Sequence, residues 1–251
     1  METLLRPATA LLALLSYAQK IILVAAMLAL PLAIVSYEFV GVERAQIAFS
    51  DRESVGVRYL IPVHRLFTAL VLARHQIAMR AAPDVSAVDA AAQSVTGEDK
   101  QDGADLGVHD KWANAQPAIS TATSGTVPKS AIPAYNTAID QVLALISTVG
   151  DASNLTLDPD IDSYYVMDAV VFRTPILLDT PMRTVDLALI DHPDGRFATP
   201  ALLAQNAAMA GKTEAAINDL ESGLSKALPA TASVPLKALR AFVDRCTLPA
   251  A

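Results

Sequence analysis

One apolar run near the N-terminus constrains this chain more than any other feature. Residues 21–40 read IILVAAMLALPLAIVSYEFV, with Glu38 as the single charged residue. This length is close to the ~20 residues that an α-helix needs to cross the ~30 Å hydrocarbon core of a bilayer. Pro31 is tolerated in such a helix, because neighbouring groups re-satisfy the carbonyl that it frees. The run therefore predicts a transmembrane helix at residues 20–41, preceded by a cytoplasmic N-terminal segment at residues 1–19.

Two other interpretations of the apolar run are a cleaved signal peptide and a buried core helix. The shorter run at residues 9–15 suits a signal peptide, whereas residues 21–40 are longer than a usual signal core and lack a clean cleavage site. Lys and Arg near the two ends number two against two, so they do not decide the orientation. The short N-terminal segment favours a cytoplasmic N-terminus. We expect a single-pass protein of the inner (cytoplasmic) membrane with residues 42–251 as an extracytoplasmic sensory domain.

Charge and composition argue against several classes of function. The net charge of −7 argues against a nucleic-acid partner, because no basic patch is present to neutralise phosphates. A single cysteine, Cys246, permits no internal disulfide. The four histidines are scattered without metal-ligand spacing, and no nucleophile–base–acid set is visible. We therefore expect neither an enzyme, nor a metal site, nor a cofactor.

Beyond residue 42, apolar residues recur at three- and four-residue steps, which predicts amphipathic helices rather than strands. The first stripe comprises Val55, Tyr59, Val63, Leu66, Phe67, Leu70 and Ile77. Its helix, at residues 43–80, follows the apolar run without a turn signal. The later predicted helices cover residues 132–150, 160–178, 202–224 and 236–246. Residues 81–130 are rich in Gly, Pro, Ser and Thr and are predicted as a loop-rich insert. The expected fold is all-α, a membrane-anchored antiparallel helical bundle of about four helices.

A dense acidic and aromatic motif, DASNLTLDPDIDSYYVMD, occupies residues 151–168 and contains five Asp residues. Asp158-Pro159 fits a helix N-cap followed by proline at the first helical position, with Asp160 in the first turn. A calcium loop fails, because Ser163 stands where Gly is required and Ala169 where Glu is required. All the favoured roles are structural ones that need no ligand.

The same motif also supplies the candidate ligand-binding residues. Adjacent tyrosines on a helix cannot both face one core, so one is free to present its ring or hydroxyl to a ligand. The candidates are Asn154, Asp158, Asp160, Tyr164 and Tyr165. A metal-dependent hydrolase that uses the Asp cluster is a remote alternative.

The segment GDASNLTLDPDIDSYYVMD at residues 150–168 resembles a signature of the extracytoplasmic input region of bacterial methyl-accepting chemotaxis proteins. The resemblance extends to AYNTAIDQVLALISTV at residues 134–149 and covers about half of the chain. It also includes Glu43, Ile47, Phe49, Glu53, Gly56, Tyr59, Leu60 and Pro62. Family members often carry His-Arg-Gly after the first long helix, where this chain has Arg74-His75-Gln76.

The resemblance implies a sensory input module for signal transduction. It implies a homodimer that detects a small molecule or a periplasmic protein and shifts one helix against another. Such receptors continue into a second membrane span, a HAMP linker and a signalling domain, which are missing from this sequence, so we expect a truncated receptor, a fragment or a stand-alone remnant. Similar input regions occur in some diguanylate cyclases and histidine kinases, which are the alternative outputs.

Overall fold

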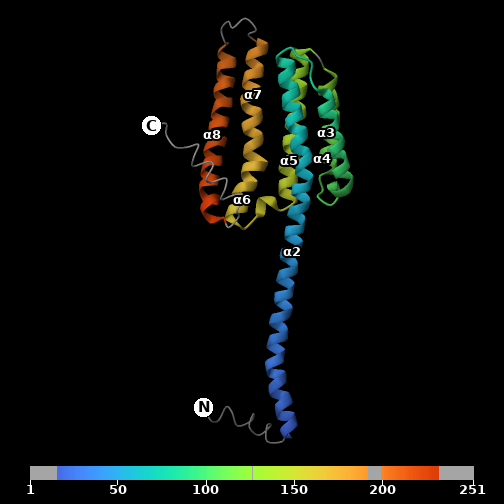
Figure 1. The fold of residues 1–251 in the computed structure, drawn as a ribbon, viewed down its shortest axis with the longest axis vertical. Helices are drawn as coiled ribbons and strands as arrows, with labels where there is room; N and C mark the ends of the chain where they lie inside the picture. The colour runs from blue at the N-terminus through green and yellow to red at the C-terminus, as the bar shows by residue number, and fades with distance from the viewer. Residues whose placement is uncertain (1–15, 126, 192–198, 232–251) are drawn as a thin grey trace. The chain divides into compact units, whose positions relative to one another are not determined.

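The described residues form helices and the short turns between them. The computed structural model describes residues 16–125, 127–191 and 199–231, and no strand occurs among them. The all-α expectation is therefore confirmed. The chain divides into an N-terminal unit, Met1–Asp51, and a C-terminal unit, Arg52–Ala251. Figure 1 shows the helices in chain order, and helix α2 (Tyr17–Ala78) contributes residues to both units.

Helix α2 begins with a reciprocal cap. The Ser16 amide donates to Gln19 Oε1 at 2.8 Å, and the Gln19 amide donates back to Ser16 Oγ at 3.4 Å. This is the capping-box arrangement, which satisfies two of the free amides at a helix start. Pro31 lies inside α2 without ending it. The part of α2 within the N-terminal unit is apolar and exposed, and by length and composition it is able to cross a membrane.

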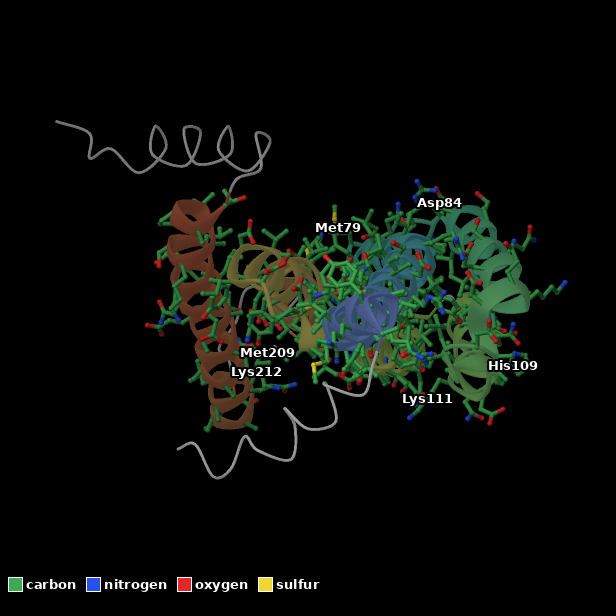
Figure 2. All side chains as sticks on the ribbon, turned by 90° about the horizontal axis from the view of Figure 1, so that it is seen from below. Met79, Asp84, His109, Lys111, Met209 and Lys212 are labelled. Atoms are coloured by element: carbon green, nitrogen blue, oxygen red, sulfur yellow. The ribbon has the colours of Figure 1, made fainter. Side chains whose placement is uncertain are left out.

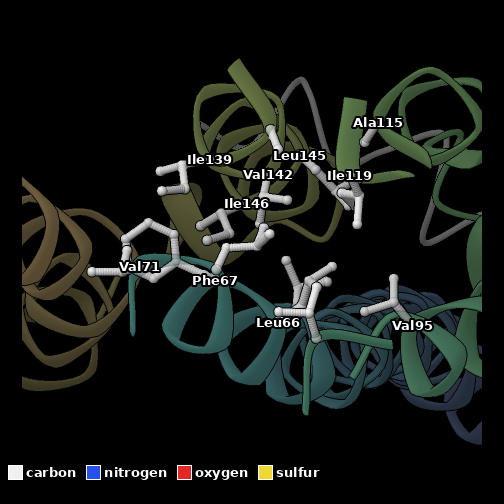
Figure 3. Close-up of a cluster of buried hydrophobic side chains, with 14 of the residues drawn as sticks. Leu66, Phe67, Val71, Val95, Ala115, Ile119, Ile139, Val142, Leu145 and Ile146 are labelled. Atoms are coloured by element: carbon white, nitrogen blue, oxygen red, sulfur yellow. The ribbon is translucent and has the colours of Figure 1, made fainter. Parts of the chain in front are cut away.

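The core of the C-terminal unit forms where α2, from Arg52 onward, packs with three further helices. These are α3 (Val85–Glu98), α4 (His109–Ser124) and α5 (Pro128–Ala152). Figure 3 shows α2 side chains facing those of α5, with α3 and α4 completing the cluster. The labelled residues are Leu66, Phe67, Val71, Val95, Ala115, Ile119, Ile139, Val142, Leu145 and Ile146. The predicted stripe of α2 thus forms one wall of the core.

The segment predicted as loop-rich, residues 81–130, is mostly helical. It contains α3, the π-helical turn η1 (Asp99–Gly103) and α4. Helix α3 starts at Val85 and is capped by Asp84, which is labelled in Figure 2. The Asp84 carboxylate accepts a bond from the Ala87 amide at 3.0 Å. The many alanines of this segment favour helix, and packing of Trp112 into the core outweighs the breaking tendency of Gly and Pro. Counting Gly and Pro as breakers was therefore misleading here.

The rest of the unit forms a second pair of long helices. After the 3₁₀ turn η2 (Leu155–Leu157), the chain is helical from 161 to 191 as α6 (Ile161–Asp168), the π-helical turn η3 (Ala169–Arg173) and α7 (Thr174–Asp191). Helix α8 (Pro200–Ala230) follows, with Thr199 Oγ1 accepting from the Leu202 amide. In Figure 1, α7 and α8 lie on one side of α2 and α5, and α3 and α4 lie on the other.

Two details of these helices differ from the predicted pattern. Helix α7 runs on to Asp191, beyond the end predicted at Leu178. In the helix predicted at residues 202–224, which is part of α8, the apolar side chain of Ile217 is exposed, and small residues such as Ala216 and Gly223 are buried instead. Small residues let helices approach closely, so the buried face of α8 contains small residues in place of Ile217. The helix predicted at residues 236–246, with Cys246, lies outside the described residues.

Candidate functional site: the acidic–tyrosine motif and a buried ionic layer

The first half of the motif forms the turn between α5 and α6. Asn154 adopts a left-handed conformation with φ 65°, which asparagine tolerates better than most residues. Its carbonyl accepts a bond from the Leu157 amide at 2.8 Å. Ser153 is buried just before it and bonds back to the Val149 carbonyl at 2.7 Å. Asn154 therefore shapes the turn.

The aspartates of the motif cap the turn in a different register from the predicted one. Helix α6 begins at Ile161, so Asp160 rather than Asp158 holds the N-cap position, where its side chain makes no capping bond. Asp158 Oδ1 accepts from the Asp160 amide at 2.9 Å. Burial, followed by the charges of Asp158 and Asp160, raises the pKa of Glu53 on α2. Among the described residues, no group of three His, Cys, Asp or Glu side chains is placed to hold a metal ion.

The two tyrosines contact each other and α8. The rings of Tyr164 and Tyr165 meet edge to face, with centroids 5.2 Å apart. Tyr165 packs on Gly223 of α8, where an added Cβ would lie 2.9 Å from the Tyr165 ring. Lys226 Nζ donates to the Tyr165 hydroxyl at 3.1 Å and lies 5.0 Å from the ring centroid. Tyr165 thus joins α6 to α8.

The five candidate residues take different roles in the described part of the chain. Tyr165 lines a hollow of about 460 Å³ together with Ile161, Lys226 and Pro229. Asn154, Asp158 and Asp160 instead hold the turn through backbone bonds. The structure therefore gives most of the motif a structural role at the corner where α5, α6 and α8 meet.

The most unusual polar feature of the C-terminal unit is a fully buried arginine. Arg74 of α2 is 0% exposed, and the carboxylates that it meets, Asp179 and Asp186 of α7, are also buried. Arg74 Nε donates to Asp186 Oδ2 at 2.7 Å, and Nη1 donates to Asp179 Oδ1 at 2.6 Å. Nη1 also donates to Asn136 Oδ1 of α5 at 3.0 Å. One guanidinium therefore ties together three helices.

Further charged side chains surround this centre. His75 Nδ1 lies 2.7 Å from Asp186 Oδ1 and acts as the donor, because a carboxylate oxygen only accepts. Arg183 bonds to Asp179 and to Asp140, each at 2.5 Å. Burial lowers the pKa of Arg183, but the two carboxylates outweigh this effect and raise its pKa, so it stays charged. We refer to Arg74, His75, Asn136, Asp140, Asp179, Arg183 and Asp186 as the ionic layer.

The ionic layer is costly to build and sensitive to geometry. Charges taken out of water repay the desolvation cost only if their hydrogen bonds are complete. Arg74 Nη2 is buried without a hydrogen-bond partner among the described residues, so one donor of the layer is unsatisfied. A small shift of α2 against α7 changes several charge-assisted bonds at once. The arrangement therefore responds to helix displacement more steeply than an apolar contact.

The ionic layer is not among the features predicted from the sequence. There, Arg74 belongs only to the Arg-His-Gln sequence that departs from the family pattern. A signal was present, since Arg74 follows Leu66 and Leu70 at four-residue steps and so lies on the core-facing stripe of α2. Asp179 and Asp186, seven residues apart, share a face of α7. A charged residue on an apolar stripe predicts a buried partner.

Comparison with known proteins adds no relationship. The chain matches no protein-family model, no curated protein and no solved structure.

Proposed function

We propose that the chain is a membrane-anchored sensory input module of the chemotaxis-receptor type. In this proposal residues 20–41 span the cytoplasmic membrane once, and the C-terminal unit lies outside it as an antiparallel helical bundle. The supporting observation is that one helix, α2, carries both the apolar run and Arg74 of the ionic layer. A ligand that moves α2 against α7 then biases the layer, and the same helix carries the displacement to the membrane.

The free energy of the Arg74 hydrogen bonds is large enough for signalling. Coupling between a ligand site and a distant output is typically about 1–3 kcal/mol. Each charge-assisted bond of Arg74 is worth a similar amount, about 1.5–3 kcal/mol. Changing the geometry of one such bond is therefore sufficient to bias an output that is close to balance.

Homodimer formation is part of the proposal and is supported by an exposed apolar face on α2. Val57, Ile61 and Leu72 are each about half exposed on this helix. Leu72 also lines a hollow of about 580 Å³ between α2 and α3. Apolar residues at such spacing suit packing against the equivalent helix of a second copy. The alternative within this class is an input module of a diguanylate cyclase or a histidine kinase. It would differ from a chemotaxis receptor in the output domain that it controls.

A receptor chimera tests the proposal. Residues 1–251 are joined to the second span, HAMP linker and kinase-control domain of a characterised chemoreceptor, in a bacterium without its own receptors. Asp186→Asn weakens the ionic layer while keeping its shape, so it should shift the basal kinase activity by several-fold. The control Lys111→Gln, on the outer surface of α4 (Figure 2), should leave that activity unchanged. Kinase activity that is equal in all three membrane-inserted chimeras would refute the proposed input role.

A further inference from the structure

A cavity of about 410 Å³ opens where α2 and α7 end and α5 begins. Its apolar wall includes Ile77, Val127, Leu189 and Ile190. Val127 is 61% exposed and Leu189 is 38% exposed, although both are large apolar residues. Exposed apolar side chains around a concave space are typical of binding sites, and the volume lies within the about 300–1,000 Å³ of small-molecule pockets.

Two cationic side chains also line this cavity. Arg80 and Lys129 are both exposed, and neither side chain forms an ion pair with a described residue. No acidic side chain is among the described residues that line the cavity. The N-terminus of α5, which begins at Pro128, adds the partial positive charge of a helix dipole. In a chain of net charge −7, this local excess of positive charge selects an anion.

The backbone at the cavity is also strained. Arg80 has a φ of 60°, a left-handed conformation that side chains other than Gly, Asn and Asp rarely adopt. Glycine would adopt this conformation without the steric penalty. Here this conformation ends α2: the Arg80 amide donates to the Ile77 carbonyl at 2.9 Å, and the Ala81 amide donates to the Gln76 carbonyl at 2.8 Å, which are the paired bonds of a Schellman cap. The cap thus fixes the backbone of Arg80 beside the cavity that its side chain lines.

We infer that this cavity binds a small organic carboxylate, with the carboxylate held by Arg80 and Lys129 and the apolar body against Ile77, Leu189 and Ile190. The site is one helical turn from the ionic layer. Ile77 follows Arg74 by three residues, and Ile190 follows Asp186 by four. A bound carboxylate therefore touches the two helices that the Arg74–Asp186 bond joins. Its effect on output rests on the proposed sensory function, whereas the binding itself does not.

Calorimetric titration of the purified full-length chain in detergent tests the binding site, with a micelle blank for each probe. Hexanoate and benzoate supply both charge and apolar body. Benzyl alcohol supplies only the body, and inorganic phosphate only the charge. We expect saturable binding of at least one carboxylate and at least ten-fold weaker binding of the other two probes. Phosphate binding as tightly as the carboxylates would overturn the apolar part of the inference.

Variants locate the site. The double variant Arg80→Gln/Lys129→Gln should weaken carboxylate binding at least ten-fold, and Lys111→Gln should not change it. Ala81→Phe fills the cavity without removing a charge and should also abolish binding. The melting temperature without ligand shows whether each variant folds, and Lys129→Gln, at an exposed position, serves alone if Arg80 proves necessary for folding.

Two results overturn the site. One is that neither carboxylate binds the wild-type chain, and the other is that the glutamine variants bind as tightly as the wild type. If the variants lose carboxylate binding but kinase activity is equal in all three chimeras, the binding site stands and the sensory function is refuted. If Asp186→Asn shifts the kinase activity but no carboxylate binds, the sensory function stands and the binding site is refuted.

Discussion

Replacing Arg74 with methionine tests whether the ionic layer stabilises the C-terminal unit as one network. Methionine fills part of the space of the arginine stem but removes its bonds to Asp186, Asp179 and Asn136. The carboxylates of Asp179 and Asp186 then differ in the partners that remain to them. Asp179 keeps its ion pair with the guanidinium of Arg183, whereas Asp186 keeps only the imidazole of His75.

The expected magnitude follows from that inequality. Removing one partner of a buried ion pair costs about 3–5 kcal/mol, because the other charge stays buried without compensation. Asp186 is 1% exposed and carries most of this cost. In a domain of this size, 1 kcal/mol shifts the melting temperature by about 2–4 °C, so Arg74→Met should lower it by roughly 6–20 °C. Adding Asp186→Asn removes the uncompensated charge and should restore about 1–3 kcal/mol.

Urea unfolding of the purified chain, followed by circular dichroism at 222 nm, measures these changes. The reasoning requires a double-mutant cycle in which Arg74→Met/Asp186→Asn is more stable than Arg74→Met alone. If Arg74→Met lies within about 1 kcal/mol of the wild type, the layer contributes too little to act as described. If the two substitutions are simply additive, Arg74 and Asp186 are not coupled, and the network interpretation fails.

Other substitutions test the packing and the charges around α2. Gly56→Ala should lower the stability by about 1–3 kcal/mol, because an added Cβ would overlap Ser153. The matched change Gly211→Ala, in open space on α8, should instead raise the stability by up to about 1 kcal/mol in the same urea assay. Glu53→Gln should stabilise the chain at neutral pH and not below about pH 4, because burial and the nearby aspartates raise the pKa of Glu53. A raised folded-state pKa favours the protonated carboxyl, so the wild type loses stability as the pH rises through it. Parallel pH–stability curves would contradict this assignment.

Much of the helical core is readable from periodicity. The predicted stripe residues Tyr59, Val63, Leu66 and Phe67 of α2 are all buried. The stripe predicted at residues 132–150 forms the buried face of α5. These predictions succeeded because helical burial repeats every three or four residues within a single segment, so neighbouring residues carry the information.

The binding candidates were less predictable. The acidic–tyrosine motif is conspicuous in the sequence, yet the structure uses Asn154 and Asp158 in a turn and Tyr165 in packing on α8. Caps and ligand contacts use the same polar residue types, so composition does not separate them. Whether Tyr164, on the more exposed side of the pair, contacts a ligand stays a prediction.

The helical class, the apolar run at residues 21–40 and the buried stripe of α2 can all be predicted from the sequence. Each depends on local spacing along one segment. The ionic layer and the cavity lined by Arg80 and Lys129 instead depend on how distant helices pack together. Arg74 meets Asp186, 112 positions away, because α2 and α7 pack in one particular register. Such a register depends on the fit of whole helix surfaces, which no single segment encodes.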